Sequence, residues 1–263
     1  MALPVLAVVD GSPVTPAVAD WAAAEAGRRG APLCLVHPLP RPLGAAPGLP
    51  GVSEVRGRAL GLLAETAARL RLDHRGLEVR TALVEDPGSG GLLAAAHGAG
   101  LVVLATHGPR HVSPRFLDAL GPAVAGRADC PTVLLHDTAP AAPTGRVVAG
   151  VDPDLPAPQV VDFALDAAVL RGAELRIVAV EREQTEHTRR VLRRLAESLA
   201  ERGPVASHAS VEDHPGSAVE ELVRVAGEGC DLLVVGCSGR RLGPVARAVV
   251  GRVRVPVAVV PHG

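Results

Sequence analysis

Three short turns follow apolar runs and could together form a ligand site. Asp10-Gly11-Ser12 comes directly after the apolar residues 5–9, His37-Pro38 comes at the end of residues 32–37, and Thr106-His107-Gly108 comes after residues 101–105. A carboxylate in such a turn could orient a ribose or a base, and the backbone N–H groups of a glycine-containing loop could receive a phosphate. Asp10 could equally be the N-cap or turn residue of a helix that starts near residue 14. Both interpretations of Asp10 stay open, because one carboxylate can serve both purposes.

The other reactive side chains do not form a catalytic pattern. His107 and His111 flank Pro109 in a loop, where solvated histidines are expected rather than a metal-binding pair. Cys237 lies in the sequence CSGRRLG, but a cysteine phosphatase needs an arginine six positions later, where this chain has Gly243. No nucleophile stands beside a base and a group that orients the base. The sequence therefore predicts no enzyme, no required cofactor and no metal site.

Composition excludes several further classes of protein. The chain has no lysine, which rules out a Walker A loop and a pyridoxal-phosphate anchor, and it has no GxGxxG dinucleotide motif. The net charge is −1 with scattered arginines, so no nucleic acid is expected as a partner. No apolar run approaches the roughly 20 residues of a membrane span, and no secretory leader is apparent. The four cysteines show no CxxC spacing. These features predict a soluble, cytoplasmic protein that does not contact membranes.

The chain is an internal repeat. Residues 5–37 match residues 147–179 at a constant offset of 142, so that Asp10 corresponds to Asp152 and Gly30 to Gly172. Later matches keep their order at smaller offsets, as when LVVLATHG (101–108) recurs as LLVVGCSG (232–239). Aligned order over the whole chain predicts two tandem domains, residues 1–138 and 144–263, joined by a short linker rich in proline.

Each copy alternates short apolar runs with longer amphipathic ones. The strands expected in the first copy are 3–9, 32–37, 77–83, 101–105 and 132–136, with helices at 14–29, 53–73, 88–98 and 115–127. Those expected in the second copy are 146–151, 174–180, 205–210, 231–236 and 256–260, with helices at 157–171, 185–202, 216–228 and 244–251. Runs such as LVVLA are apolar at every position, as in strands that helices cover on both faces. The pattern predicts two Rossmann-like α/β domains, each a five-stranded, mostly parallel sheet with helices on both faces.

These segments resemble the universal stress protein family in its tandem form. The resemblance rests on VVDGSP (8–13), APLCLVH (31–37), LATHG (104–108) and RADCPTVLL (127–135), with their repeats, and covers essentially the whole chain. It implies the flavodoxin-like strand order 3-2-1-4-5 in each domain. In the nucleotide-binding branch of the family it also implies an ATP site. That branch carries G-x2-G-x9-G-S/T after strand four, an aspartate of strand one near the nucleoside, and a backbone clamp on adenine after strand two.

The resemblance places candidate nucleotide contacts in both copies, and both sets depart from the family pattern. The candidates in the first copy are Asp10, Gly11, Ser12, Pro38, Thr106, Gly108 and Gly121. Their counterparts in the second copy are Asp152, Val180, Gly236, Gly239 and Gly243. In the first copy Pro38 has no N–H to donate to adenine, and neither alignment of the closing glycine supplies a hydroxyl. The second copy lacks about nine loop residues after Gly239 and carries Asp154 where a phosphate would lie.

The resemblance and its departures together predict a non-enzymatic binding or regulatory module of the stress response with degenerate nucleotide sites. The alternative is an ATP-binding switch that uses the first domain, with or without slow hydrolysis. In either case adenine nucleotide is expected to bind weakly, and to the first domain. A further expectation is that the two domains pair within the chain through TVLLH (132–136) and VAVVP (257–261), because unpaired apolar edge strands invite aggregation. The sequence does not name a protein partner.

Overall fold

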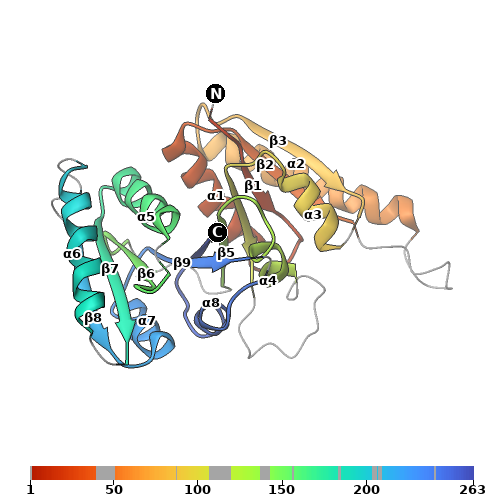
Figure 1. The fold of residues 1–263 in the computed structure, drawn as a ribbon. Coiled ribbons are helices and arrows are strands. Elements are labelled where there is room, and N and C mark those ends of the chain that lie inside the picture. The colour runs from red at the N-terminus through yellow and green to blue at the C-terminus, as the bar shows by residue number, and fades with distance from the viewer. Residues whose placement is uncertain are drawn as a thin grey trace. The chain divides into compact units, whose positions relative to one another are not determined.

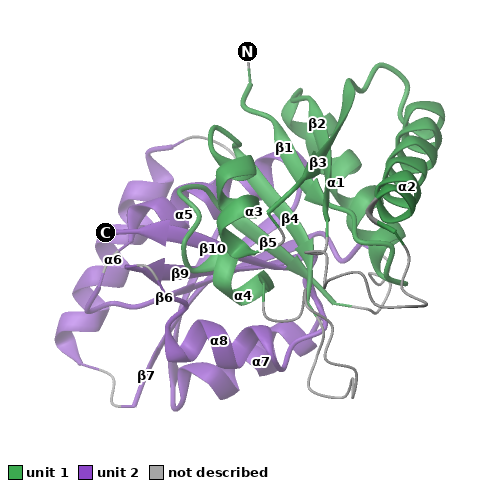
Figure 2. Cartoon of the chain, turned by 90° about the vertical axis from the view of Figure 1, so that its right-hand side faces the viewer, with its two compact units in different colours: residues 1–107, 112–137 green, residues 108–111, 138–263 purple. Residues whose placement is uncertain are grey.

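The computed structural model describes residues 2–39, 51–86, 88–106, 120–136, 143–155, 157–182, 185–202, 206, 209–239 and 241–263. Within the described chain, residues up to 136 form one compact unit and residues from 143 onward form a second (Figures 1 and 2). Of the expected polar segments, most of the loop at 38–51 and of the linker at 137–145 lies outside the described residues.

Strands and helices alternate strictly in both units. Unit 1 contains β1 (Val5–Val8), α1 (Thr15–Arg29), β2 (Leu33–Pro38), α2 (Val52–Asp73), β3 (Val79–Val84), α3 (Ser89–Ala96), β4 (Leu101–Ala105), α4 (Leu120–Ala125) and β5 (Thr132–Leu135). Unit 2 contains β6 (Arg146–Val151), α5 (Pro158–Arg171), β7 (Glu174–Glu181), α6 (Glu186–Ala200), β8 (Ser210–Pro215), α7 (Ala218–Gly227), β9 (Leu232–Ser238), α8 (Pro244–Val250) and β10 (Val257–His262).

The strand order confirms the expected fold. In unit 1 the strands lie in the order β3-β2-β1-β4-β5, and in unit 2 the order is β8-β7-β6-β9-β10. Every described pairing within a unit is parallel. Helix α1 packs against α2, and α3 packs against α4, so the helices of unit 1 form two layers. Both units therefore have the doubly wound architecture, in which the chain reverses direction across the sheet between the first and fourth strands.

Burial differs between the strands of unit 1. All residues of β1, β4 and β5 are buried, whereas the edge strand β3 exposes Arg80, Thr81 and Ala82. The cores consist of valine, leucine and alanine, as the composition requires. Among the described helices, none is both long and apolar enough to cross a membrane.

The internal repeat is also a repeat of local geometry. Helices α1 and α5 end at Gly30 and Gly172, which adopt left-handed backbone angles (φ 58° and 60°). In both copies the residue after the glycine donates its N–H to a helix carbonyl, at 2.9 Å from Ala31 to Ala26 and 2.9 Å from Ala173 to Ala168. Only glycine adopts this conformation without a steric cost, which explains why both copies carry it at the same place.

The position of β8 corrects one expectation. The strand was expected at residues 205–210, but it occupies Ser210–Pro215, five residues later. The strand is at the end of the strand order and, among the described residues, pairs with β7 alone, so Ser210–His214 are half-buried and Pro215 is exposed. An apolar run is a good marker of a central strand, but an edge strand is commonly charged, which protects it from pairing with other molecules.

A network of ion pairs joins β8 to β7 and α7. The Arg176 guanidinium donates two hydrogen bonds to the Glu212 carboxylate, at 2.9 and 2.8 Å, and a third to Glu228 at 3.1 Å. His214 Nε2 lies 3.0 Å from Glu212 Oε2. These hydrogen bonds, that of Arg176 above all, lower the pKa of Glu212 from 4.5 to about 2, although its partial burial acts in the opposite direction.

Unit 2 should accordingly lose stability in acid. Because the pKa of Glu212 is lower in the folded state, its ionised form stabilises the fold above about pH 4.5, and this contribution disappears as the pH falls toward 2. We expect Glu212→Gln to reduce the free energy of unfolding of unit 2 by about 1–2 kcal/mol at pH 7 and by much less near pH 2. Urea unfolding at both pH values measures the difference, and an equal loss at both would contradict the role of the charge.

Candidate functional site

The turn after β1 is organised by the Asp10 side chain. Asp10 Oδ1 accepts hydrogen bonds from the Ser12 N–H at 3.0 Å and from the Thr15 hydroxyl at 2.7 Å, and the Gly11 N–H donates to Thr15 Oγ1 at 3.0 Å. The N-cap of α1 is Val14, without a side-chain cap, so Asp10 is a turn residue rather than the helix cap. Only Oδ1 takes part in these bonds. The second oxygen, Oδ2, has no hydrogen bond within the described part of the chain.

Gly11 and Ser12 each have a distinct place in this turn. Gly11 has a φ of +78°, a backbone conformation that favours glycine. A Cβ at this position would lie 3.4 Å from Leu62 Cδ2, which is an ordinary contact. Ser12 is 9% exposed, and its Oγ has no hydrogen-bond partner among the described residues. A buried hydroxyl without a partner costs free energy, which a ligand that hydrogen-bonds to it would recover.

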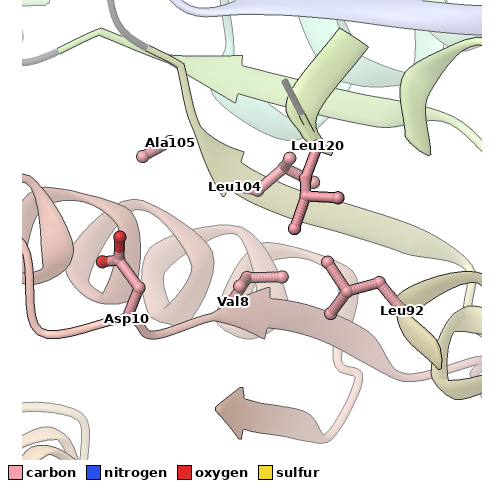
Figure 3. Close-up of a pocket in the computed structure, with 6 residues that line it drawn as sticks. All are labelled: Val8, Asp10, Leu92, Leu104, Ala105 and Leu120. Atoms are coloured by element: carbon pink, nitrogen blue, oxygen red, sulfur yellow. The ribbon is translucent and has the colours of Figure 1, made fainter. Parts of the chain in front are cut away.

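A hollow opens beside this turn, between the carboxyl ends of β1 and β4. It is lined by Val8, Asp10, Leu92, Leu104, Ala105 and Leu120 and has a volume of about 240 Å³, including the part open to solvent. Figure 3 shows the apolar side chains converging, with the Asp10 carboxylate at one end. This is the point at which the strand order reverses, where open α/β sheets bind their ligands. The part of this space that is enclosed by the side chains measures only about 10 Å³, about the room of one water molecule, so the hollow could receive the edge of a ligand but does not enclose one.

His37 was expected in one of the three turns at this edge of the sheet, without a role of its own. Its Nδ1 lies 2.6 Å from the Val9 carbonyl oxygen at the end of β1. Since a carbonyl can only accept, Nδ1 donates, and Nε2 of the neutral ring keeps its lone pair. Burial lowers the pKa of His37, while the Val9 carbonyl and the Asp10 charge act in the opposite direction. The available signal in the sequence was its place at the end of the strand next to β1.

The end of β2 offers no free backbone donor. Pro38 belongs to the strand, in register with Val84, and has no N–H. The next N–H, of Leu39, is already donated to the Val84 carbonyl at 2.8 Å. A nucleobase at this position would therefore meet carbonyl oxygens rather than N–H groups.

The candidates after β4 have structural roles where they are described. Thr106 is buried, and its N–H donates to the Leu135 carbonyl at 2.7 Å. Gly121 lies inside α4, where a Cβ would come within 3.3 Å of the Ala105 carbonyl oxygen and of Leu104 Cδ1. Its glycine is thus explained by the close approach of α4 to β4. Gly108, together with His107 and His111, lies outside the described residues.

Unit 2 repeats the first turn without its full set of hydrogen bonds. Asp152 Oδ1 accepts from the Asp154 N–H at 3.0 Å, as Asp10 does from Ser12. The position equivalent to Thr15 is Ala157, which has no hydroxyl to donate to the carboxylate. Asp154 is exposed beside this turn and adds a second negative charge.

The space that corresponds to the hollow is filled differently in unit 2. Gly150 and Gly236 correspond to Val8 and Ala105. A Cβ on Gly150 would lie 2.9 Å from two methyl carbons of Leu222, and a Cβ on Gly236 would lie 2.6 Å from His262 Nε2. Leu222 and His262 therefore occupy the positions that the Val8 and Ala105 side chains take in unit 1.

The remaining candidates of unit 2 lie on separate elements. Val180 is half-exposed in β7, opposite His214 of β8. Gly239 has a φ of +73° after β9, and Gly243 is the N-cap of α8 with an ordinary extended backbone. Gly236 is the candidate that lies against His262.

The cysteines are thiols, not thiolates. All four are free, and burial raises the pKa of each one. The Cys237 thiol donates a weak hydrogen bond to the Arg241 carbonyl, with the sulfur and oxygen 3.3 Å apart. A raised pKa disfavours the thiolate, which is the nucleophilic form of cysteine. Among the described residues, no group of three or more His, Cys, Asp or Glu could hold a metal ion.

Comparison with known families gives the strongest evidence on identity. The profile of the universal stress protein family matches residues 1–136 and again residues 143–261. The chain belongs to the universal stress protein family. The resemblance inferred from VVDGSP and its companion segments is therefore confirmed, and the family match covers the chain twice.

Relatives and solved structures agree with this assignment. A universal stress protein of Mycobacterium tuberculosis is 29% identical over 289 aligned positions, which cover 95% of this chain and 94% of the relative. The crystal structure of a universal stress protein from Archaeoglobus fulgidus superposes with a TM-score of 0.81 at 18% identity, covering 99% of this chain and 98% of that one. A putative universal stress protein from Pseudomonas aeruginosa superposes with a TM-score of 0.70 at 20% identity, covering 99% and 94% of the two chains. At these identities the structures support the fold alone.

Proposed function

We propose that this universal stress protein is a non-enzymatic, regulatory binding module in which only unit 1 keeps a nucleotide site, and that this site is weak. The observation that carries the proposal is the hollow at the switch point, with Asp10 at its rim. A ribose hydroxyl could donate to Asp10 Oδ2, which has no hydrogen bond within the described residues. Ser12 Oγ in the adjoining turn also lacks a partner among them, but it is buried and does not line the hollow, so a ligand would reach it only if the turn moved. The stress response as the setting follows from the family alone.

The arrangement of side chains supports binding rather than catalysis. Activating a hydroxyl nucleophile requires a base within hydrogen-bond distance. Ser12 Oγ has no such partner among the described residues, and His37 donates from Nδ1 to a backbone carbonyl instead. Asp10 Oδ1 is occupied by the turn itself. We therefore assign no catalytic role to these residues.

The asymmetry between the units supports a single site. In unit 2, Leu222 and His262 fill the space next to Gly150 and Gly236, and Asp154 would repel a phosphate. In unit 1 the corresponding space is the hollow. Adenine nucleotide is thus proposed as a ligand of unit 1 only.

ATP should bind weakly. A site without the Pro38 N–H and without a loop hydroxyl lacks about two hydrogen bonds, each worth about 0.5–1.5 kcal/mol, which weakens binding by about fivefold to a hundredfold. We expect a dissociation constant in the high micromolar range or above, measured by isothermal titration calorimetry. Mass spectrometry of the purified protein should find little co-purified adenine nucleotide. Sub-micromolar affinity with stoichiometric ATP would instead favour the alternative function, an ATP-dependent switch.

A further inference from the structure

Four arginines cover the solvent side of one helix in unit 2. Arg189, Arg190, Arg193 and Arg194 are all exposed on α6. The residues that α6 buries are Thr188, Leu192 and Leu199, and the helix packs against β8. The apolar face of α6 is therefore already used, and its outward side carries a compact group of positive charge, here called the arginine face.

The arginine face is largely without acidic partners. Arg189 forms one long ion pair, in which its Nη1 lies 3.8 Å from Glu186 Oε2. Arg190, Arg193 and Arg194 form no ion pair with any carboxylate of the described residues. On other helices of this chain, arginines pair with acids one turn away, as Arg58 does with Glu54 and Arg69 with Asp73.

The arginine face contains two like-charge pairs at helical spacing, beside two pairs of opposite charge, Glu186 with Arg190 and Arg193 with Glu197. Arg189 and Arg193, and likewise Arg190 and Arg194, stand four residues apart, where side chains of a helix are neighbours. Like charges at this spacing destabilise a helix by about as much as opposite charges stabilise it. An anionic partner would turn this repulsion into attraction.

We propose that the arginine face is a docking surface for a short acidic segment of a partner protein. Guanidinium groups bind carboxylates through two parallel hydrogen bonds, and two rows of arginines four residues apart match glutamates spaced in the same way on a helix. The face extends about 7.5 Å along α6, since each of the five steps from Arg189 to Arg194 rises about 1.5 Å. That length accommodates about two to four carboxylates.

A nucleic acid fits this surface less well. Exposed Glu186 precedes the four arginines, and exposed Glu197 and Glu201 follow them, so a continuous phosphate backbone would meet negative charge at either end. The chain as a whole has a net charge of −1 and offers no extended positive field. Helix α6 also carries no aromatic side chain on which a base could stack.

The test uses the whole chain and a fluorescein-labelled helical peptide with glutamates at positions i, i+1, i+4 and i+5. Fluorescence anisotropy at low salt should show binding that weakens about tenfold in the triple variant Arg190→Gln, Arg193→Gln and Arg194→Gln. A matched triple variant, Arg75→Gln, Arg247→Gln and Arg254→Gln, makes the same change of charge at exposed arginines elsewhere and should weaken binding less than twofold. The α6 variant should unfold at about the same temperature as the unmodified protein, because the repulsions that it relieves and the Glu186–Arg190 and Arg193–Glu197 attractions that it removes are of similar size.

Three outcomes would overturn the proposal. The first is an equal loss in both triple variants, which would mean that only total charge matters. The second is equal binding of a peptide with the same composition but its glutamates dispersed round the helix. The third is tighter binding of a single-stranded oligonucleotide of equal charge, which would assign the arginine face to nucleic acid.

Discussion

Replacing Asp10 with alanine should weaken ATP binding at least tenfold, whereas Asp152→Ala should change it less than twofold. Asp10 holds the Ser12 N–H and the Thr15 hydroxyl and lines the hollow, and its Oδ2 has no hydrogen bond among the described residues, so its loss removes both the turn and the charge. A hydrogen bond to a charged group is worth about 1.5–3 kcal/mol, which corresponds to about tenfold or more in affinity. Titration with a fluorescent ATP analogue, extended to millimolar concentration, measures the change.

Asp10→Asn separates the two contributions of this residue. The asparagine oxygen can still accept from Ser12 and Thr15, so the turn should persist while the negative charge is lost. If Asp10→Asn binds like Asp10→Ala, the carboxylate itself contacts the ligand; if it binds like the unmodified protein, the turn geometry is what matters. Should Asp152→Ala abolish binding while Asp10→Ala leaves it unchanged, the site has been assigned to the wrong unit.

The largest loss of stability is expected for Gly91→Ala. A Cβ on Gly91, near the start of α3, would lie 2.2 Å from the Asp86 carbonyl oxygen and 2.9 Å from Val84 Cγ1. The closest of these atoms belongs to the backbone and cannot move aside, so the start of α3 must shift. We expect the free energy of unfolding of unit 1 to fall by about 3 kcal/mol. Leu92, the next residue, lines the hollow, so nucleotide binding should weaken as well.

Gly61→Ala is the matched control for this substitution. Gly61 lies within α2, and a Cβ there would have no atom within 4 Å. Alanine should therefore stabilise unit 1 by about 0.5–1 kcal/mol through its higher helix propensity. Urea unfolding followed by circular dichroism compares the two variants, and a Gly91→Ala protein as stable as Gly61→Ala would show that α3 packs less tightly than described.

Most of the architecture could be predicted because it depends on patterns that are local in the sequence. Fully apolar runs marked β1, β4 and β9, and the glycines at 30 and 172 marked two helix ends. The exception was β8, since an edge strand has only one neighbouring strand and needs no apolar run. Its charged residues are stabilised by Arg176 of β7, a partner that lies 36 positions before Glu212.

The candidate site was predictable only in outline. Parallel pairing predicts that Asp10, Pro38 and Thr106 lie at strand ends along one edge of the sheet. The absence of an N–H on Pro38 is a property of proline itself. The packing role of Gly121 was not predictable, because it depends on how closely α4 approaches the Ala105 carbonyl. His37 likewise gained its place from a hydrogen bond to Val9, 28 positions away.

By itself, the sequence determined the two copies, the order of their elements and the family, because repetition and apolar periodicity can be read along the chain. Only the tertiary structure decided what lies beside the small residues at the ends of the strands. Gly150 and Gly236 appear in the sequence as two small residues that should leave room, yet Leu222 and His262 fill the space beside them. Whether a space stays open depends on side chains that arrive from distant elements, and their volumes meet only after the chain has folded.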